Sequence, residues 1–166
     1  MKLSIVGCPD KKLFRPFVKK AATFYAETLI SKKLLDNVFI KIQFSKDLPY
    51  YGTTEVEEYN NWNKPREFLI QLHSGIGAAN ILETLAHEMV HVKQFAYSDS
   101  NEPAVRWRGK KEHIGEYYTE PWEIEAHGLE SGLFTKFVVQ EMLWEFFEGI
   151  KNPDAPIEIR PLGWKV

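Results

Sequence analysis

Two histidines with a glutamate between them are the residues of this sequence best suited to do chemistry. They form the segment His87-Glu88-Met89-Val90-His91. Side chains four positions apart share one face of an α-helix, so both imidazoles can reach a single ion. Glu88 would then stand beside the ion, where it can act on an ion-bound water. Neutral imidazole suits zinc, and a catalytic zinc needs three protein ligands plus an open position. The spacing therefore predicts Zn²⁺ bound by His87 and His91.

A third ligand must come from elsewhere in the chain. The segment 121–128 contains Glu123, Glu125 and His127. On a helix, Glu123 and His127 share one face, whereas Glu125 points about 160° away from Glu123. We favour Glu123 as the ligand, with His127 one turn on and able to orient a neighbouring group by a hydrogen bond. Glu125 and His127 itself remain alternatives, and an acidic first turn is also favoured by the helix dipole alone.

The motif is expected to lie on a helix that directly follows a strand. Residues 67–73 alternate as a strand does, and the glycine-containing turn 74–77 ends it. Pro121, which is tolerated in a first helical turn, is expected to open a last long helix that runs to about Gly149. The helix at 78–97 is predicted from apolar residues at helical spacing: Ala78, Ile81, Leu82, Leu85, Met89, Val92 and Phe95.

The remaining segments predict an α+β fold with a small mixed sheet of about three to four strands. The sheet would pack against an N-terminal helix, the helix with the histidines and the long C-terminal helix. A loop from 97 to 120 is unusually long for a compact domain, and such loops are often functional. The other expected elements are a strand at 2–6, a helix at 13–35, a strand at 38–44 and a weaker strand at 53–59, followed by a turn at 60–65.

Composition indicates one globular domain over residues 1–166, with 150–166 as an extended tail. The chain has 166 residues, of which 44% are hydrophobic and 27% charged. Its single cysteine, Cys8, cannot form an internal disulfide and excludes a cysteine-cluster metal site. No apolar run approaches the ~18 residues of a membrane span, and the apolar run at the N-terminus is too short for the hydrophobic region of a signal peptide. We expect a cytoplasmic protein without a membrane partner.

Charge is unevenly distributed along the chain. Residues 1–50 carry ten Lys/Arg and four Asp/Glu, whereas the remainder carries eleven and nineteen. A basic half can bind nucleic acid. The simpler explanation is a solvated helix face, because no aromatic-plus-basic signature accompanies the lysines. Nucleic acid is therefore only a secondary expectation.

With these residues in view, the chain resembles the small single-domain gluzincin metallopeptidases. The likeness covers roughly residues 10–150 and rests on His-Glu-x-x-His followed by a glutamate that opens a later helix. It is similar to minimal zincin cores, including ImmA/IrrE-like and SprT-like groups and uncharacterised phage and bacterial metallopeptidases. Three positions depart from these families. Phe95 and Tyr97 replace the later histidines of SprT-like proteins and metzincins, and His127 stands where gluzincins commonly have Asp or Asn.

The resemblance implies a metalloendopeptidase with zinc bound by His87, His91 and Glu123, acting on a peptide or protein substrate. Glu88 would take a proton from the zinc-bound water and pass it to the leaving amine. The strand 67–73 would be an exposed edge that pairs with the substrate chain. Candidates for polarising the carbonyl or supporting a ligand are His113, Tyr117, Tyr118 and His127.

The competing hypothesis is a non-catalytic module, with zinc serving only structure or binding. Glu88 argues against it, because a purely structural site has no use for that carboxylate. A fourth protein ligand, such as His113 or His127, would close the site and favour it.

Overall fold

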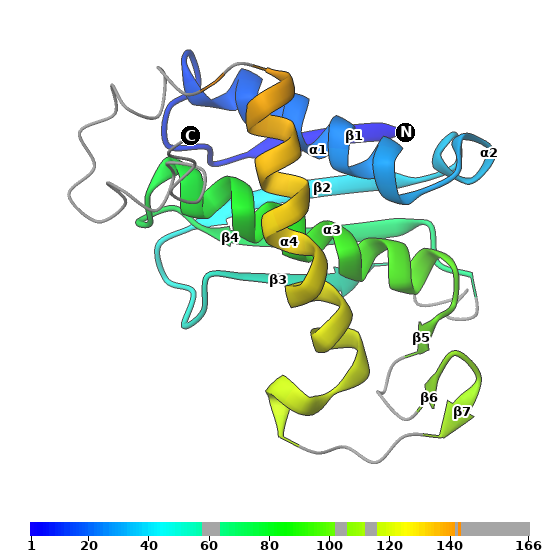
Figure 1. Cartoon of the computed structure of the whole chain (residues 1–166). Helices are drawn as coiled ribbons and strands as arrows, with labels where there is room; N and C mark the ends of the chain where they lie inside the picture. Colours follow the sequence, from blue (N-terminus) through cyan, green and yellow to red (C-terminus); the bar gives the residue numbers. More distant parts are fainter. Residues whose placement is uncertain (58–63, 102–105, 112–115, 142, 144–166) are drawn as a thin grey trace, which may run out of the picture.

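The protein is built on a four-stranded mixed sheet, as the sequence predicts (Figure 1). The computed structural model describes residues 1–57, 64–101, 106–111, 116–141 and 143. The spatial strand order is β1-β2-β4-β3, with β1, β2 and β4 parallel and β3 antiparallel to β4. The strands are β1 (Lys2–Val6), β2 (Phe39–Ser45), β3 (Gly52–Val56) and β4 (Glu67–His73).

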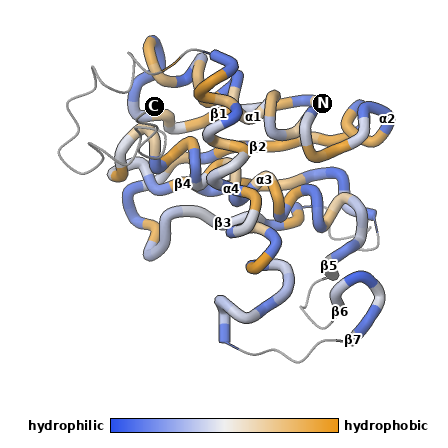
Figure 2. Tube along the Cα trace, in the orientation of Figure 1, coloured by the Kyte–Doolittle hydropathy of each residue, from blue (hydrophilic) through white to orange (hydrophobic). Residues whose placement is uncertain are grey.

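One face of the two central strands carries the core. Alternate residues are buried on β2 and on β4, and they pair across the strands: Ile40 opposite Phe68, Ile42 opposite Ile70, and Phe44 opposite Leu72. This alternation has the period of two that places every second side chain on one face. Figure 2 shows β2 as a largely hydrophobic segment. The helices that cover this face must therefore bring apolar residues of their own.

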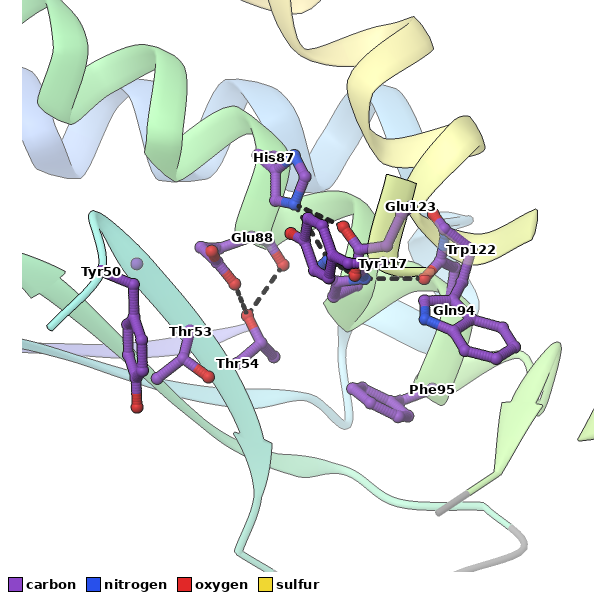
Figure 3. Close-up of a pocket in the computed structure, with 12 residues that line it drawn as sticks. Tyr50, Thr53, Thr54, His87, Glu88, Gln94, Phe95, Tyr117, Trp122 and Glu123 are labelled. Atoms are coloured by element: carbon purple, nitrogen blue, oxygen red, sulfur yellow. Dashed lines mark hydrogen bonds and ion pairs between the residues drawn. The ribbon is translucent and has the colours of Figure 1, made fainter. Parts of the chain in front are cut away.

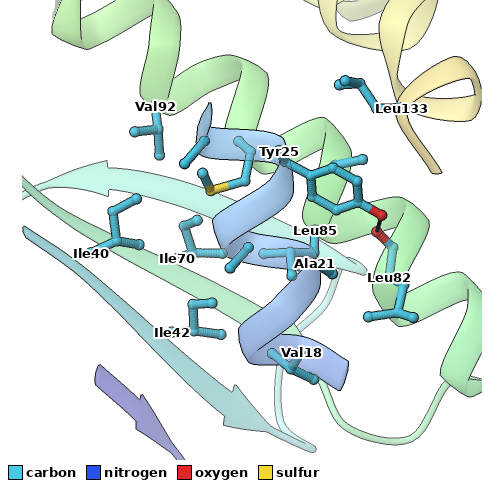
Figure 4. Close-up of a cluster of buried hydrophobic side chains, with 14 of the residues drawn as sticks. Val18, Ala21, Tyr25, Ile40, Ile42, Ile70, Leu82, Leu85, Val92 and Leu133 are labelled. Carbon is cyan, nitrogen blue, oxygen red and sulfur yellow. Dashed lines mark hydrogen bonds between the residues drawn. The ribbon is translucent and has the colours of Figure 1, made fainter. Parts of the chain in front are cut away.

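Three long helices complete the core. They are α1 (Phe14–Leu29), α3 (Ala78–Ala96) and α4 (Pro121–Gln140). Val18, Ala21 and Tyr25 of α1 lie beside the buried residues of α3 and the sheet (Figure 4). Tyr25 is fully buried and satisfies its hydroxyl by donating to the Leu82 carbonyl at 3.2 Å. Helix α4 crosses α3, so the last helix is held against the helix of the histidine motif (Figure 1).

The N-terminal helix is interrupted, which corrects the expected single helix at 13–35. α1 ends at Leu29, and Ile30 is extended, with φ −122° and ψ 132°. A short α2 (Lys32–Leu35) follows. The Ser31 N–H donates to the Tyr97 hydroxyl at 2.9 Å instead of to a helical carbonyl. A tertiary partner thus replaces the helical bond at this point, and the sequence pattern does not reveal it.

The last helix is also shorter than expected, because it ends at Gln140 and not near Gly149. The Leu143 N–H donates to the Val138 carbonyl at 3.1 Å, five residues back, which is a bond typical of helix ends. The remainder of the expected helix and the tail 150–166 lie outside the described residues, as does most of the turn expected at 60–65.

The segment expected as a loop at 97–120 contains a small antiparallel sheet. Its strands are β5 (Ser100–Asn101), β6 (Arg106–Trp107) and β7 (Lys110–Lys111), and a 3₁₀ turn η1 (Tyr117–Thr119) leads into α4. Arg108 and Gly109 both have positive φ, 49° and 79°, as a two-residue hairpin turn requires. Within the described residues, no helix is long and apolar enough to cross a membrane.

The strand at 67–73 is not the free edge, which corrects that expectation. β4 pairs with β2 on one side and with β3 on the other. Among the described strands of this sheet, β3 occupies the edge next to β4. Any substrate strand added on this side would therefore pair with β3.

Candidate metal centre

Two histidines of α3 and one glutamate of α4 converge in a buried group (Figure 3). The Nε2 atoms of His87 and His91 are 3.1 Å apart. Glu123 places Oε2 3.3 Å from His87 Nε2 and Oε1 3.4 Å from His91 Nε2. His87 and Glu123 are 5% and 6% exposed, so water screens this group little. These are the three residues that the sequence favoured as ligands, and together they can hold a metal ion.

The start of α4 is fixed to α3 by a buried glutamine. Gln94 is 1% exposed, and its Nε2 donates to the Trp122 carbonyl at 2.9 Å and to Glu125 Oε2 at 3.0 Å. Trp122 and Ala126 are buried on either side of Glu123 along α4. This anchoring sets the rotation of α4, and Glu123 consequently points toward the histidines.

Each histidine has a partner that determines which ring nitrogen carries the proton. Gln94 uses its nitrogen as a donor, so its Oε1 accepts from His91 Nδ1 at 2.8 Å. Glu130 Oε2 accepts from His87 Nδ1 at 2.7 Å. When both rings are neutral with the proton on Nδ1, as metal binding requires, both Nε2 atoms present lone pairs to the same space. Two lone pairs facing each other at 3.1 Å favour a cation between them.

The spacing of the three ligand atoms suits such a cation. Tetrahedral coordination with bonds of about 2.0–2.1 Å separates ligand atoms by about 3.3–3.4 Å. The two Nε2 atoms are 3.1 Å apart, and each lies 3.3 or 3.4 Å from a different oxygen of the Glu123 carboxylate. Glu123 Oε2 is buried and has no hydrogen-bond partner among the described residues. A buried polar atom of this kind is costly unless something binds it, so the donor set fits a metal ion.

The pKa shifts agree with a site for positive charge. Burial lowers the pKa of His87, but the carboxylates of Glu123 and Glu130 outweigh it and raise that pKa to about 9. Burial raises the pKa of Glu88 to about 7, although a hydrogen bond from Thr54 opposes the rise. Two carboxylates beside one imidazole thus favour a cation there, while Glu88 is nearly balanced between its neutral and charged forms at neutral pH.

Glu88 lies beside the ligand group without belonging to it. Its side chain is 4% exposed, and Oε2 accepts a hydrogen bond from the Thr54 hydroxyl at 2.7 Å (Figure 3). Like the three ligand candidates, it lines a cavity of about 380 Å³. This is the position in which a carboxylate can reach a molecule bound at the metal.

The centre lies where two cavities meet. The second cavity is about 660 Å³ and shares His87, Glu88, Tyr117, Tyr50 and Gly52 with the first. The smaller cavity continues toward the C-terminal part of α3, and the larger one toward its N-terminal part. An extended chain passing over the centre would therefore find space on both sides.

The other candidates from the sequence lie around this group or outside the described residues. Tyr117 lines both cavities, and Tyr118 lines only the larger one and is 75% exposed. The His127 ring centroid is 4.6 Å from that of His87, and its Nδ1 is 3.2 Å from Glu130 Oε1. His127 is not in one group with Glu123 and His91. His113 lies outside the described residues.

Glu125, the alternative ligand, faces a different set of partners. Lys93 Nζ lies 2.9 Å and Arg108 Nη2 2.7 Å from its carboxylate. Burial raises the pKa of Glu125, but the hydrogen bonds from Gln94 and Lys93 outweigh it, and the pKa is lowered overall. Glu125 therefore ties the β6–β7 turn and α3 to α4 and is not in the metal-ligating group.

Three supporting residues were missed by the sequence analysis. Glu130 stands seven positions after Glu123, two helical turns on the same face, and Gln94 stands three positions after His91, so helical phase contained a signal for both. Thr54 is 34 residues from Glu88 along the chain, and no local pattern links them.

Comparison with known proteins gives no match: no family model, no curated protein and no solved structure matches the chain. The structure itself supplies a His-His-Glu group on buried helices, which is consistent with a zincin-like site.

Removing the Glu130 carboxylate is expected to weaken metal binding without abolishing it. Glu130→Ala leaves His87 Nδ1 without its acceptor, so the ring loses both its fixed orientation and some basicity. We expect the dissociation constant for zinc to rise about 10- to 100-fold, measured by competition with a chelating dye. Glu27→Ala, at an exposed position of α1, is the control and should bind like the wild type. Equal affinity in both variants would show that Glu130 does not support the centre.

Proposed function

We propose that this protein is a zinc-dependent metalloendopeptidase. The observation that carries the proposal is the convergence of His87 Nε2, His91 Nε2 and a Glu123 oxygen that has no hydrogen-bond partner among the described residues, next to the buried Glu88 carboxylate. Two imidazoles and one carboxylate are the ligand set of many catalytic zinc sites. When bound, zinc would polarise a peptide carbonyl and lower the pKa of a water.

Glu88 is the general base of this proposal. It takes a proton from the attacking water and then gives that proton to the leaving amine. A general base works best with a pKa near the operating pH, and burial brings the pKa of Glu88 to about 7. Its position outside the ligand group leaves both of its oxygens free of the metal.

Tyr117 is the candidate for stabilising the developing oxyanion. It lines both cavities beside His87 and Glu88. Burial raises the pKa of its hydroxyl, and the neighbouring Glu123 raises it further. The hydroxyl therefore keeps its proton at neutral pH and can donate it to a negative oxygen.

The edge strand β3 would hold the substrate backbone. The Tyr51 carbonyl accepts a hydrogen bond from β4 at 2.8 Å, and the Glu57 N–H donates to β4 at 2.9 Å. Bonded pairs alternate along an antiparallel ladder, so the backbone groups of Gly52, Thr54 and Val56 face away from β4. A peptide can add a strand there, beside the centre, because Gly52 and Thr54 also line the smaller cavity.

Elemental analysis with a protease assay tests the proposal. Protein dialysed against zinc and then against buffer should hold one zinc per chain, and it should cleave casein in a reaction that a chelator stops and zinc restores. Zinc content near zero would refute the metal site. Zinc at one per chain, with no casein cleavage and no binding of a peptide hydroxamate, would refute the peptidase and favour a closed, structural site.

A further inference from the structure

Two residues of the edge strand β3 enclose the Glu88 carboxylate from the side of the sheet. Thr54 Oγ1 lies 2.7 Å from Glu88 Oε2 and 3.1 Å from the Glu88 backbone carbonyl. A hydroxyl has one proton, and the shorter contact to a carboxylate is the stronger hydrogen bond. Thr54 is 9% exposed and Glu88 4%, so water competes little for this bond.

Gly52 leaves the space that is occupied by the other oxygen of the same carboxylate. A Cβ added at Gly52 would lie 2.7 Å from Glu88 Oε1, 2.7 Å from Thr84 Cγ2 and 3.0 Å from Glu88 Cγ. The φ of Gly52 is outside the left-handed region. Glycine is therefore needed here for space and not for backbone conformation, and the space it leaves is filled by Glu88.

We propose that Thr54 and Gly52 are positioning residues for Glu88; the inference rests on the proposed function. Thr54 fixes Oε2 by its hydrogen bond, and Gly52 lets the carboxylate lie against the strand with Oε1 at the wall of the cavity. A free glutamate side chain samples several rotamers, and this enclosure selects one of them. Catalysis depends on such placement, because a misplacement of about 1 Å can cost on the order of 100-fold in rate.

The same two residues face the open edge with their backbone groups. A peptide that pairs with β3 would form backbone hydrogen bonds with Gly52 and Thr54. Thr54 also holds the Glu88 carboxylate by its side-chain hydroxyl, and Gly52 leaves room for that carboxylate because it has no side chain. Substrate backbone and general base are then placed by one short strand. Glu88 itself is carried by α3, and its hydrogen bond with Thr54 couples the base to the strand that would hold the substrate.

Substitution of Thr54 tests the proposal, with serine as the matched control. Thr54→Val keeps the shape and removes the hydroxyl, whereas Thr54→Ser keeps the hydroxyl. We expect Thr54→Val to lower kcat on casein-derived peptides about 10- to 100-fold with KM and zinc content nearly unchanged, and Thr54→Ser to retain most of the activity. Binding of a peptide hydroxamate gives a second readout, since its N–OH proton bonds to the base.

A double-mutant cycle on hydroxamate affinity distinguishes positioning from general support of the fold. If Thr54 acts through Glu88, Thr54→Val should weaken binding in the wild type and add nothing in Glu88→Ala, which lacks the group that accepts the Thr54 hydrogen bond. An equal loss in both backgrounds, or Thr54→Ser behaving like Thr54→Val, would overturn the proposal. If Thr54→Val binds the hydroxamate and cleaves peptides as well as the wild type does, the positioning role of Thr54 is refuted. The proposed function would not be affected by that result.

Gly52→Ala provides the second variant if Thr54→Val does not fold. The added methyl group must displace Glu88 or Thr84, so kcat and hydroxamate affinity should fall while zinc content stays at one per chain. Full activity in a folded Gly52→Ala would contradict the inference. Wild-type protein that neither cleaves peptides nor binds the hydroxamate would refute the proposed function, and the positioning role with it.

Discussion

Glu88→Gln is expected to lower peptide hydrolysis by ~10²–10⁴-fold while leaving the metal in place. Glutamine has the size of glutamate but cannot take a proton from water at neutral pH. Glu88 is not in the metal-ligating group, so zinc content should remain one per chain. Its amide oxygen can still accept from the Thr54 hydroxyl, and the fold should therefore persist. The measurement is kcat/KM on a peptide substrate together with elemental analysis.

The Glu88→Gln experiment needs a control variant and a result that would contradict it. Glu27→Gln, at an exposed position of α1, should match the wild type. Wild-type activity in Glu88→Gln would refute the role of Glu88 as general base even with zinc present. Should neither protein cleave the chosen peptide, hydroxamate binding decides. A wild type that binds the inhibitor has an accessible metal, whereas one that does not is closed to substrate.

Much of the centre was predictable because the relevant spacing is local. His87 and His91 are one turn apart on a helix whose apolar face is plain in the sequence, and helical phase separates Glu123 from Glu125. The structure brings His87, His91 and Glu123 into one group as this reasoning expected. Residues whose relative positions follow from the helical period alone can therefore be grouped from the sequence.

The helix interruption, the role of Thr54 and the strand order were missed because they depend on contacts between distant segments. Ser31 leaves the helical ladder to bond with Tyr97, 66 residues away, and Thr54 reaches Glu88 across 34 residues. The error about the free edge has the same origin. The alternation of β4 reports that one of its faces is buried, but strand order depends on pairing between segments and leaves no local periodicity.

His87→Ala and His91→Ala are each expected to weaken zinc binding on the order of 10²–10³-fold. Structural zinc sites with four protein ligands have binding free energies of about 10–16 kcal/mol, so each ligand there supplies roughly 2.5–4 kcal/mol. A loss of 1.4 kcal/mol corresponds to a factor of about ten in affinity. A methyl group cannot replace an imidazole nitrogen. His73→Ala is the control, because His73 lies at the end of β4 and is not in the metal-ligating group. Tight zinc binding in His87→Ala would show that the metal lies elsewhere.

Glu123→Gln and Glu125→Gln separate the two carboxylates that the sequence left open as third ligand. Glu123 has a buried oxygen without a hydrogen-bond partner and lies 3.3–3.4 Å from both histidines, so its replacement by a neutral amide should weaken zinc binding strongly. Glu125 is paired with Lys93 and Arg108, so Glu125→Gln should retain zinc and lower the thermal midpoint instead. Competition with a chelating dye and thermal unfolding of both variants give the comparison. If Glu125→Gln loses the metal and Glu123→Gln keeps it, α4 is rotated from the arrangement described, because two residues two positions apart on a helix cannot both point at the two histidines.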